Sequence, residues 1–195
     1  MTFKYRIQIT YIILGLVVVF LASQSFKDAK PILSTADSLQ TGLIHKNDIY
    51  NTVYRLVSKV DYSKHFKLEK NVLNHTVTCQ IILESGWYKS KLATNSNNPL
   101  GHKAKGNEPF VQLGTWEIVK GKKVNTTAKF RKYKSINECI ENHFTSFLLK
   151  PRYKKVRSSK SIYEFFIRLQ QSGYATDKNY PIKLINIYLG HEAEH

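Results

Sequence analysis

The first helical pattern of the folded part of the chain lies after residue 45, where an apolar residue occurs at every third or fourth position. This spacing places apolar side chains on one face of a helix, so we predict a helix over 47–61. A second helix is predicted over 74–85, where Val77, Ile81 and Glu84 follow one another at helical spacing. Glu84 is therefore expected in the last turn of a helix, on a face that is otherwise apolar.

The middle of the chain changes from a helical to an extended pattern. Residues 109–119 read PFVQLGTWEIV and residues 124–130 read VNTTAKF, with the turn-forming KGKK between them, which predicts a β-hairpin. Helical signals return at Ser135, where SINE has the form of a capping box, and at Ser161, where SIYE repeats it. Gly173 is expected to end the second of these helices, and Pro181 to open a last helix that Gly190 closes. The predicted fold class is α+β, mostly helical with one small central hairpin.

The N-terminal segment is the most apolar part of the chain. Residues 7–22 contain no charged side chain, and Lys4 and Arg6 precede them. The run is shorter than the ~20 residues that cross a bilayer comfortably. We favour an uncleaved signal anchor, because no clean A-x-A cleavage site is present; cleavage after SQS at 23–25 is the alternative. A buried core helix fits less well, because the run is terminal, uniformly apolar and preceded only by cations.

These patterns predict four parts in the chain. Residues 1–6 would be a short cytoplasmic basic segment, and residues 7–23 an N-terminal hydrophobic helix that acts as signal anchor or signal peptide. Residues 24–45 carry weak periodicity and turn formers, which is typical of a linker. Residues 46–195 would form the folded domain, and either export route places that domain outside the cytoplasm.

The composition is strongly basic. Lys and Arg outnumber Asp and Glu by 30 to 14 over 195 residues, a formal net charge of +16, so attraction to polyanions or anionic surfaces is expected. Nucleic acid is not the expected partner, because the basic residues are spread over strands and loops without a binding motif.

Cys79 and Cys139 belong to no metal-ligand pattern, and two buried free thiols are favoured over a disulfide. His75 and His143 are interpreted as structural, and no metal or organic cofactor is expected.

Glu84 is the first candidate for chemistry. A glutamate near a helix end is usually a solvated surface residue, but here the negative end of the helix dipole and the apolar face both disfavour ionisation. Both effects raise the pKa, and a general acid must be protonated near neutral pH. Glycoside hydrolysis generally needs a second acidic group. Glu117, beside Trp116 on the hairpin, is the candidate, and a cross-strand ion pair with a lysine is the structural alternative.

Aromatic residues are concentrated around these segments. Sugar rings stack on aromatic faces, although a protein core uses the same side chains. Tyr174 and Tyr180 flank the polar turn ATDKN and are the better candidates for a cleft, while Phe130 is assigned to the core. Trp87 and Tyr133 are the further aromatic candidates for substrate binding.

Three segments carry a resemblance to a known family. They are QIILESGWYKSKLATNSNNPLGHKA (80–104), TTAKFRKYKSINECIENHFTSFL (126–148) and LQQSGYATDKNYPIKLINI (169–187). Together they resemble the bacterial glucosaminidase domain of glycoside hydrolase family 73, over about residues 46–190. The resemblance implies a lysozyme-like fold and activity as a peptidoglycan hydrolase.

The resemblance also implies residue roles. Glu84 matches the general acid, Glu117 matches a second glutamate in the β-lobe, and Tyr180 matches a tyrosine thought to assist at the reacting sugar. Asn97, Asn98 and Gly101 match the loop that lines the cleft. The departures from the family pattern are Tyr88 where glycine is common, and Pro99, Leu100 and His102 in the cleft loop, which affect the expected substrate preference more than catalysis.

The expected function is that of an endo-β-N-acetylglucosaminidase that cleaves after N-acetylglucosamine in peptidoglycan glycan strands. The expected location is the cell membrane through the N-terminal helix, or the cell wall if that helix is cleaved, with anionic wall polymers as partners of the basic surface. A muramidase or lytic transglycosylase on the same fold is the alternative enzyme. A non-catalytic module that binds teichoic acid in the wall is the alternative without catalysis.

Overall fold

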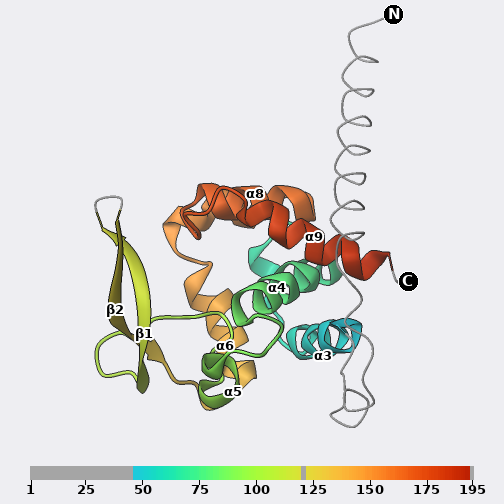
Figure 1. Cartoon of the computed structure of the whole chain (residues 1–195). Helices are drawn as coiled ribbons and strands as arrows, with labels where there is room; N and C mark the ends of the chain where they lie inside the picture. The colour runs from blue at the N-terminus through green and yellow to red at the C-terminus, as the bar shows by residue number, and fades with distance from the viewer. Residues whose placement is uncertain (1–45, 120–121, 194–195) are drawn as a thin grey trace, which may run out of the picture. The chain divides into compact units, whose positions relative to one another are not determined.

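The computed structural model describes residues 46–119 and 122–193, with side chains for all of these except residues 63, 116–119 and 122–123. In this part of the chain a group of helices packs around one central helix, and a two-stranded hairpin extends from the group (Figure 1). The predicted segments 1–6, 7–23 and 24–45 lie outside the described residues, so they stay predictions. None of the helices in the described part is long and apolar enough to span a bilayer.

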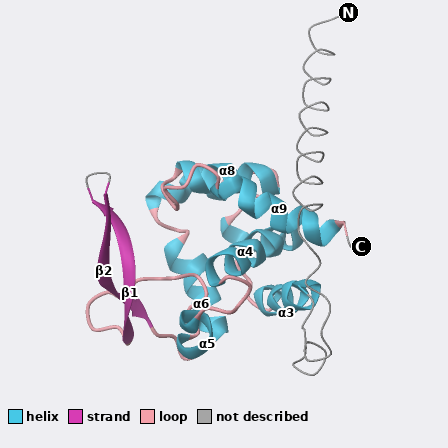
Figure 2. Cartoon of the chain, viewed as in Figure 1, coloured by secondary structure: helices cyan, strands magenta, loops and turns pink. Residues whose placement is uncertain are grey.

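Helices make up most of the described chain, as Figure 2 shows in cyan. The α-helices are α3 (Lys46–Ser58), α4 (Lys70–Ser85), α5 (Lys91–Ser96), α6 (Ile136–Asn142), α7 (Lys154–Arg157), α8 (Ile162–Gln171) and α9 (Tyr180–Glu192). The 3-10 turns are η1 (Ser63–His65) and η3 (Pro151–Tyr153), and the segment η2 (His143–Phe147) is a π-helical turn.

The central helix α4 forms the middle of the core. It packs against α3, α8 and α9, and ten of its residues, from Leu73 to Ser85, are buried. Helices that are covered on several sides lose the alternation of apolar and polar faces, which is why polar residues such as Gln80 are also fully buried here. The helices predicted over 47–61 and 74–85 are present as α3 and α4, although α4 begins at Lys70 rather than at position 74.

The helix caps follow the sequence signals. Ser135 Oγ accepts a hydrogen bond from the Glu138 backbone N–H, and Ser161 Oγ accepts one from that of Glu164, each at 3.2 Å. The two predicted capping serines are therefore confirmed. The prediction that Gly190 closes the last helix is wrong, because α9 continues to Glu192.

The hairpin is a two-stranded antiparallel sheet of β1 (Phe110–Val119) and β2 (Lys122–Arg131), in register from Phe110 opposite Arg131 to Val119 opposite Lys122. The preceding loop is tied to the end of β2. The Arg131 N–H donates to the His102 carbonyl at 2.8 Å, and the Ala104 N–H donates to the Lys129 carbonyl at 2.9 Å. The loop that follows α5 is thereby fixed to the base of the hairpin. Cys79 and Cys139 are buried free thiols, as predicted.

Candidate active site

Glu84 lies in the last turn of α4, directly before the chain leaves the helix. The helix ends because Gly86 takes a left-handed conformation with φ 58°, which glycine adopts without the steric cost of a Cβ atom. The Trp87 N–H then donates to the Ile82 carbonyl at 2.9 Å. This hydrogen bond closes the helix end and fixes Glu84, which precedes Gly86 by two positions.

The left-handed turn continues over two residues that are not glycine. Trp87 and Tyr88 have φ values of 60° and 62°, a conformation that costs an L-residue roughly 1–2 kcal/mol. Ser85 holds the turn together, because its Oγ donates to the Ile81 carbonyl at 2.5 Å and accepts from the Tyr88 N–H at 2.8 Å. The backbone after Glu84 is therefore strained, and packing and hydrogen bonds hold it in place.

Tyr180, the first residue of α9, contacts Glu84 directly. Its hydroxyl donates a hydrogen bond to Glu84 Oε1 at 2.7 Å, although the two residues are 96 positions apart in sequence. The Tyr180 ring lies next to that of Tyr174, with ring centroids 5.6 Å apart. A carboxyl group and two phenols therefore form one cluster, which the packing of α9 against α4 brings together.

The environment of Glu84 raises its pKa. The Glu84 side chain is exposed to the solvent of a cavity, but protein packs around its other sides, and this partial desolvation raises the pKa of the carboxyl group. The hydrogen bond from Tyr180 acts in the opposite direction, because it favours the carboxylate. Burial is the larger effect, so the sequence prediction of a raised pKa is confirmed in direction. A protonated carboxyl group at this place can donate a proton to a leaving oxygen.

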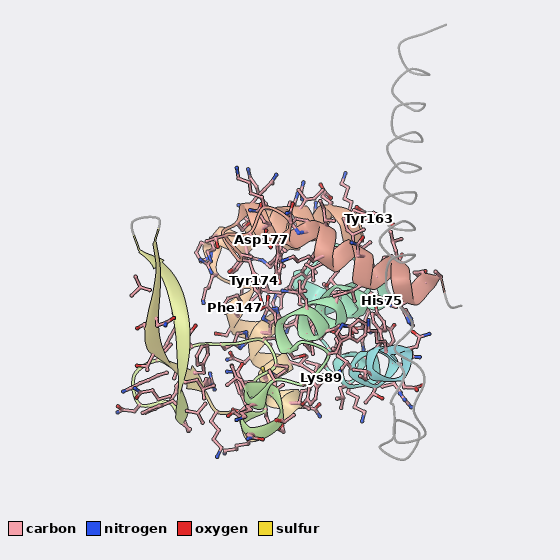
Figure 3. All side chains as sticks on the ribbon, viewed as in Figure 1. His75, Lys89, Phe147, Tyr163, Tyr174 and Asp177 are labelled. Carbon is pink, nitrogen blue, oxygen red and sulfur yellow. The ribbon has the colours of Figure 1, made fainter. Side chains whose placement is uncertain are left out.

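The Glu84 side chain lines a cavity of about 650 Å³, a size typical of sites for small molecules or for part of a polymer. Five of the residues predicted for substrate binding or catalysis line it: Glu84, Gly101, Tyr133, Tyr174 and Tyr180. Phe147 also lines it, and Figure 3 shows Phe147 and Tyr174 next to each other on the side of the helices nearest the hairpin.

Three other predicted substrate-binding residues do not line this cavity. Asn98 is fully buried, and its amide nitrogen donates to the carbonyls of His102 at 2.8 Å and Arg131 at 2.7 Å. The Asn97 amide donates to the Tyr133 carbonyl at 3.1 Å. Both asparagines thus fix the loop around Gly101 rather than reach the cavity. Trp87 is half-buried in the turn after α4.

Glu117 lies in β1, where its backbone pairs with Val124. Its side chain is not among those that the structure describes. Its role therefore stays a prediction.

The cavity floor contains a chain of hydrogen bonds that the sequence did not predict. The Tyr133 hydroxyl donates to Asn142 Oδ1 at 2.9 Å, so it accepts from His102 Nδ1 at 2.7 Å. His102 Nε2 in turn accepts from His143 Nδ1 at 3.0 Å. Burial lowers the pKa of His102 to about 3 and that of His143 well below its ordinary value, so both rings are neutral. The interpretation of His143 as structural fits this placement.

The π-helical turn η2 places His143 in this network, and the sequence did not predict a turn of this kind. The capping box at Ser135 predicts one continuous helix, but the α-helical pattern stops at Asn142 and the next turn is wider. The turn carries His143 and Phe147, whose rings stack with centroids 5.4 Å apart. The apolar spacing and the capping box do not distinguish such a turn from an ordinary helix. Among the described side chains, no group of three or more His, Cys, Asp or Glu is arranged to hold a metal ion.

Comparison with known proteins agrees with this geometry. A family model described as "Glucosaminidase: Mannosyl-glycoprotein endo-beta-N-acetylglucosaminidase" matches residues 60–192. The exo-glucosaminidase LytG of Bacillus subtilis (strain 168) is 38% identical over 119 residues, which are 58% of this chain and 42% of LytG. The chain therefore spans less than half the length of this relative.

Solved structures share the fold. The C-terminally truncated glycoside hydrolase domain of FlgJ from Salmonella typhimurium matches with a TM-score of 0.58 and 28% identity, over 76% of this chain and 99% of that domain. The catalytic domain of the autolysin Auto from Listeria monocytogenes matches with a TM-score of 0.64 and 24% identity, over 84% of this chain and 97% of that domain. The second likeness concerns the fold alone. The predicted lysozyme-like α+β class, helical with a small two-stranded sheet, is confirmed.

Proposed function

The chain belongs to the glucosaminidase family, and we propose that it hydrolyses the glycan strands of peptidoglycan with Glu84 as general acid. The observation that carries this proposal is the position of Glu84 at the cavity, with a pKa raised by burial and with Tyr180 bonded to one carboxyl oxygen. The other oxygen, Oε2, is free of that bond and can face the glycosidic oxygen of a bound strand. General acids of this kind contribute about 10²–10⁴-fold to the rate.

Glu117 is the proposed second acidic group. Its place on β1 is compatible with a carboxylate that approaches the sugar from the hairpin, where it would position water or stabilise the positively charged transition state. Tyr180 would orient the substrate's acetamido group as well as bond to Glu84. This division of roles follows the family resemblance of both residues and the Tyr180 hydrogen bond.

The proposed cleavage is internal and follows N-acetylglucosamine. The description of the family model supports an endo-glucosaminidase, whereas the relative LytG is named an exo-glucosaminidase. Product analysis separates these modes. Internal cleavage releases long fragments from the first minutes, and cleavage from an end releases small saccharides while the strands stay long.

The deciding experiment is digestion of purified cell walls by the wild-type chain and by the Glu84→Gln, Glu117→Gln and Glu141→Gln variants. Glu141 is an exposed glutamate on α6 outside the cavity, so its variant controls for the loss of one charge. We expect the rate to fall by about 10²–10⁴-fold for Glu84→Gln, and to stay unchanged for Glu141→Gln.

Mass spectrometry of the same products tests the bond that is cleaved. Fragments with N-acetylglucosamine at the reducing end support the proposal, whereas anhydro-muramic products would identify a lytic transglycosylase. Reducing ends of muramic acid would identify a muramidase. If Glu84→Gln retained the full lytic rate, Glu84 would not be the general acid. If the wild-type chain bound walls but released no fragments, it would be a wall-binding module rather than an enzyme.

The proposed location is outside the cytoplasm, at the membrane through residues 7–23 or in the wall after cleavage. The strongly basic chain, with a formal net charge of +16 over all 195 residues, would be held in an anionic wall. Membrane fractionation of cells that express the full chain tests the anchor, and elution from isolated walls by rising salt tests the charge. Elution that does not depend on ionic strength would contradict retention by charge.

A further inference from the structure

Three cations lie close together at the cavity that Glu84 also lines. We call Lys105, Lys150 and Arg152 the basic cluster; Lys105 and Lys150 line the cavity itself. The Lys150 ammonium sits 4.0 Å from the centroid of the Phe147 ring, and the Arg152 guanidinium carbon sits 6.0 Å from the same centroid. Phe147 therefore lies within cation–π distance of Lys150, which lines the cavity, and of Arg152, which lies nearer the Tyr153 ring at 4.5 Å.

Among the described residues, the two lysines of this cluster lack the carboxylate partners that Arg131 has. Arg131 also lines the cavity, but it forms ion pairs with Glu108 at 2.9 Å and Glu138 at 3.5 Å. Within the described part of the chain, no carboxylate forms an ion pair with the ammonium of Lys105 or Lys150. Glu108 accepts a hydrogen bond from the backbone N–H of Lys105, not from its side chain.

The mutual repulsion of the cluster is visible in its electrostatics. Burial lowers the pKa of Lys150, and the positive charges of Lys105 and Arg152 lower it further. Like charges that are held close together are destabilising, so the arrangement becomes favourable only when an anion binds among them. The ring beneath them is fixed, because Phe147 stacks on His102 with centroids 4.9 Å apart.

We propose that the basic cluster is a subsite for a carboxylate carried by the glycan strand, so that the enzyme prefers strands whose peptide substituents keep their negative charge. This inference rests on the proposed function, because the subsite and Glu84 share one cavity. The peptides of peptidoglycan end in carboxylates, and a strand bound with its glycosidic bond at Glu84 would extend its substituents along the cavity. Lysine suits such a partner, since its flexible ammonium follows a mobile peptide group without a fixed bidentate geometry.

The test compares two forms of one substrate. Glycan strands with intact peptides are freed of phosphate-containing polymers, and in half of the sample the carboxylates are converted to methylamides. The KM and kcat of the full chain are then measured on both forms. Two partly exposed lysine contacts, each worth roughly 2- to 5-fold, predict that KM rises about tenfold when the carboxylates are neutralised.

The variant Lys105→Gln/Lys150→Gln should show nearly the same KM on both forms, within about twofold. The control is Lys70→Gln/Lys91→Gln, which removes two exposed lysines outside the cavity and should keep the full preference. The wild-type preference should weaken as salt is added. Equal wild-type KM values on the two forms would overturn the proposal, and so would a double variant that keeps the preference.

Two further measurements show whether the ligand assignment or the proposed activity is wrong. If methylamidated strands that retain their phosphate polymers restore the low KM, the ligand is a phosphate and the carboxylate assignment is wrong. Binding is also measured by sedimentation with the Glu84→Gln chain, which needs no hydrolysis. Loss of binding on methylamidation supports the subsite even if no variant is active, so the failure of the proposed activity is distinguishable from the failure of the subsite.

Discussion

Replacement of Tyr180 by phenylalanine tests how the structure sets the pKa of Glu84. The Tyr180 hydroxyl donates to Glu84 Oε1 at 2.7 Å. A hydrogen bond to a charged group contributes about 1.5–3 kcal/mol and one between neutral groups about 0.5–1.5 kcal/mol. The bond therefore favours the carboxylate by roughly 1–1.5 kcal/mol before solvent in the cavity weakens it. Without the hydroxyl, the pKa of Glu84 should rise further.

The sign of the effect on activity follows from the role of Glu84. A general acid acts in its protonated form, so activity falls as pH rises through its pKa. A higher pKa keeps Glu84 protonated to higher pH, so the alkaline limb of the pH profile of kcat/KM should shift to higher pH. Since 1.36 kcal/mol corresponds to one pH unit, we expect a movement of about half to one pH unit after allowance for solvent.

The assay is the initial rate of hydrolysis of soluble glycan strands over a range of pH. The control is Tyr163→Phe, because Tyr163 is an exposed tyrosine on α8 that does not line the cavity (Figure 3). The maximum rate of Tyr180→Phe can fall as well, because Tyr180 is also expected to contact substrate. The midpoint of the alkaline limb is therefore the decisive quantity. A midpoint that stays in place or moves to lower pH would refute the reasoning.

Three further predictions concern the supports of the site. Asn98→Asp should lower the free energy of unfolding by about 2–6 kcal/mol, because two carbonyls lose a buried donor; urea denaturation checks this against the exposed Asn95→Asp, and a loss equal to that of the control would contradict it. In the same assay Tyr88→Gly should be about 1 kcal/mol more stable than Tyr88→Ala, because both lose the ring but only alanine keeps the cost of the positive φ; equal values would count against strain. Stability should fall as pH drops below 6.5, down to about 3 for His102, because the unfolded chain binds protons at His102 and His143 more readily than the folded one. The slope is at most roughly 1.4 kcal/mol per pH unit for each histidine. His102→Leu should flatten this fall in thermal unfolding, and an unchanged slope would show that His102 does not titrate as described.

Features that depend on a few neighbouring residues could be predicted from the sequence. The end of α4 follows from the Ser85-Gly86 break and from the apolar spacing before it, and this alone put Glu84 at a helix terminus. The direction of its pKa shift then followed from the apolar face. The capping serines at 135 and 161 were predictable for the same reason, since a cap involves residues only three positions apart.

Contacts between distant segments could not be derived in this way. The hydrogen bond between Tyr180 and Glu84 depends on how α9 packs against α4, and no local pattern determines that packing. Only the family resemblance indicated Tyr180. The same resemblance grouped Asn98 with the cleft residues, whereas the structure places it behind the loop, with its side-chain hydrogen bonds made to the protein. Similar motifs identify the segments that form the site, but they do not distinguish a side chain that contacts substrate from one that fixes the loop.

The position of the basic cluster also bears on why Glu84 can act as an acid. A cation beside a carboxyl group favours its ionised form and lowers its pKa. Burial raises the pKa of Glu84 and the Tyr180 hydrogen bond lowers it, and no lysine or arginine contributes to the shift. Tyr174 contacts Tyr180, Phe147 contacts Lys150, and the Tyr174 and Phe147 rings pack edge to face with centroids 5.8 Å apart. These neutral rings would let one cavity hold a protonated acid and an anion subsite, since a cation placed nearer Glu84 would remove the proton that the reaction needs.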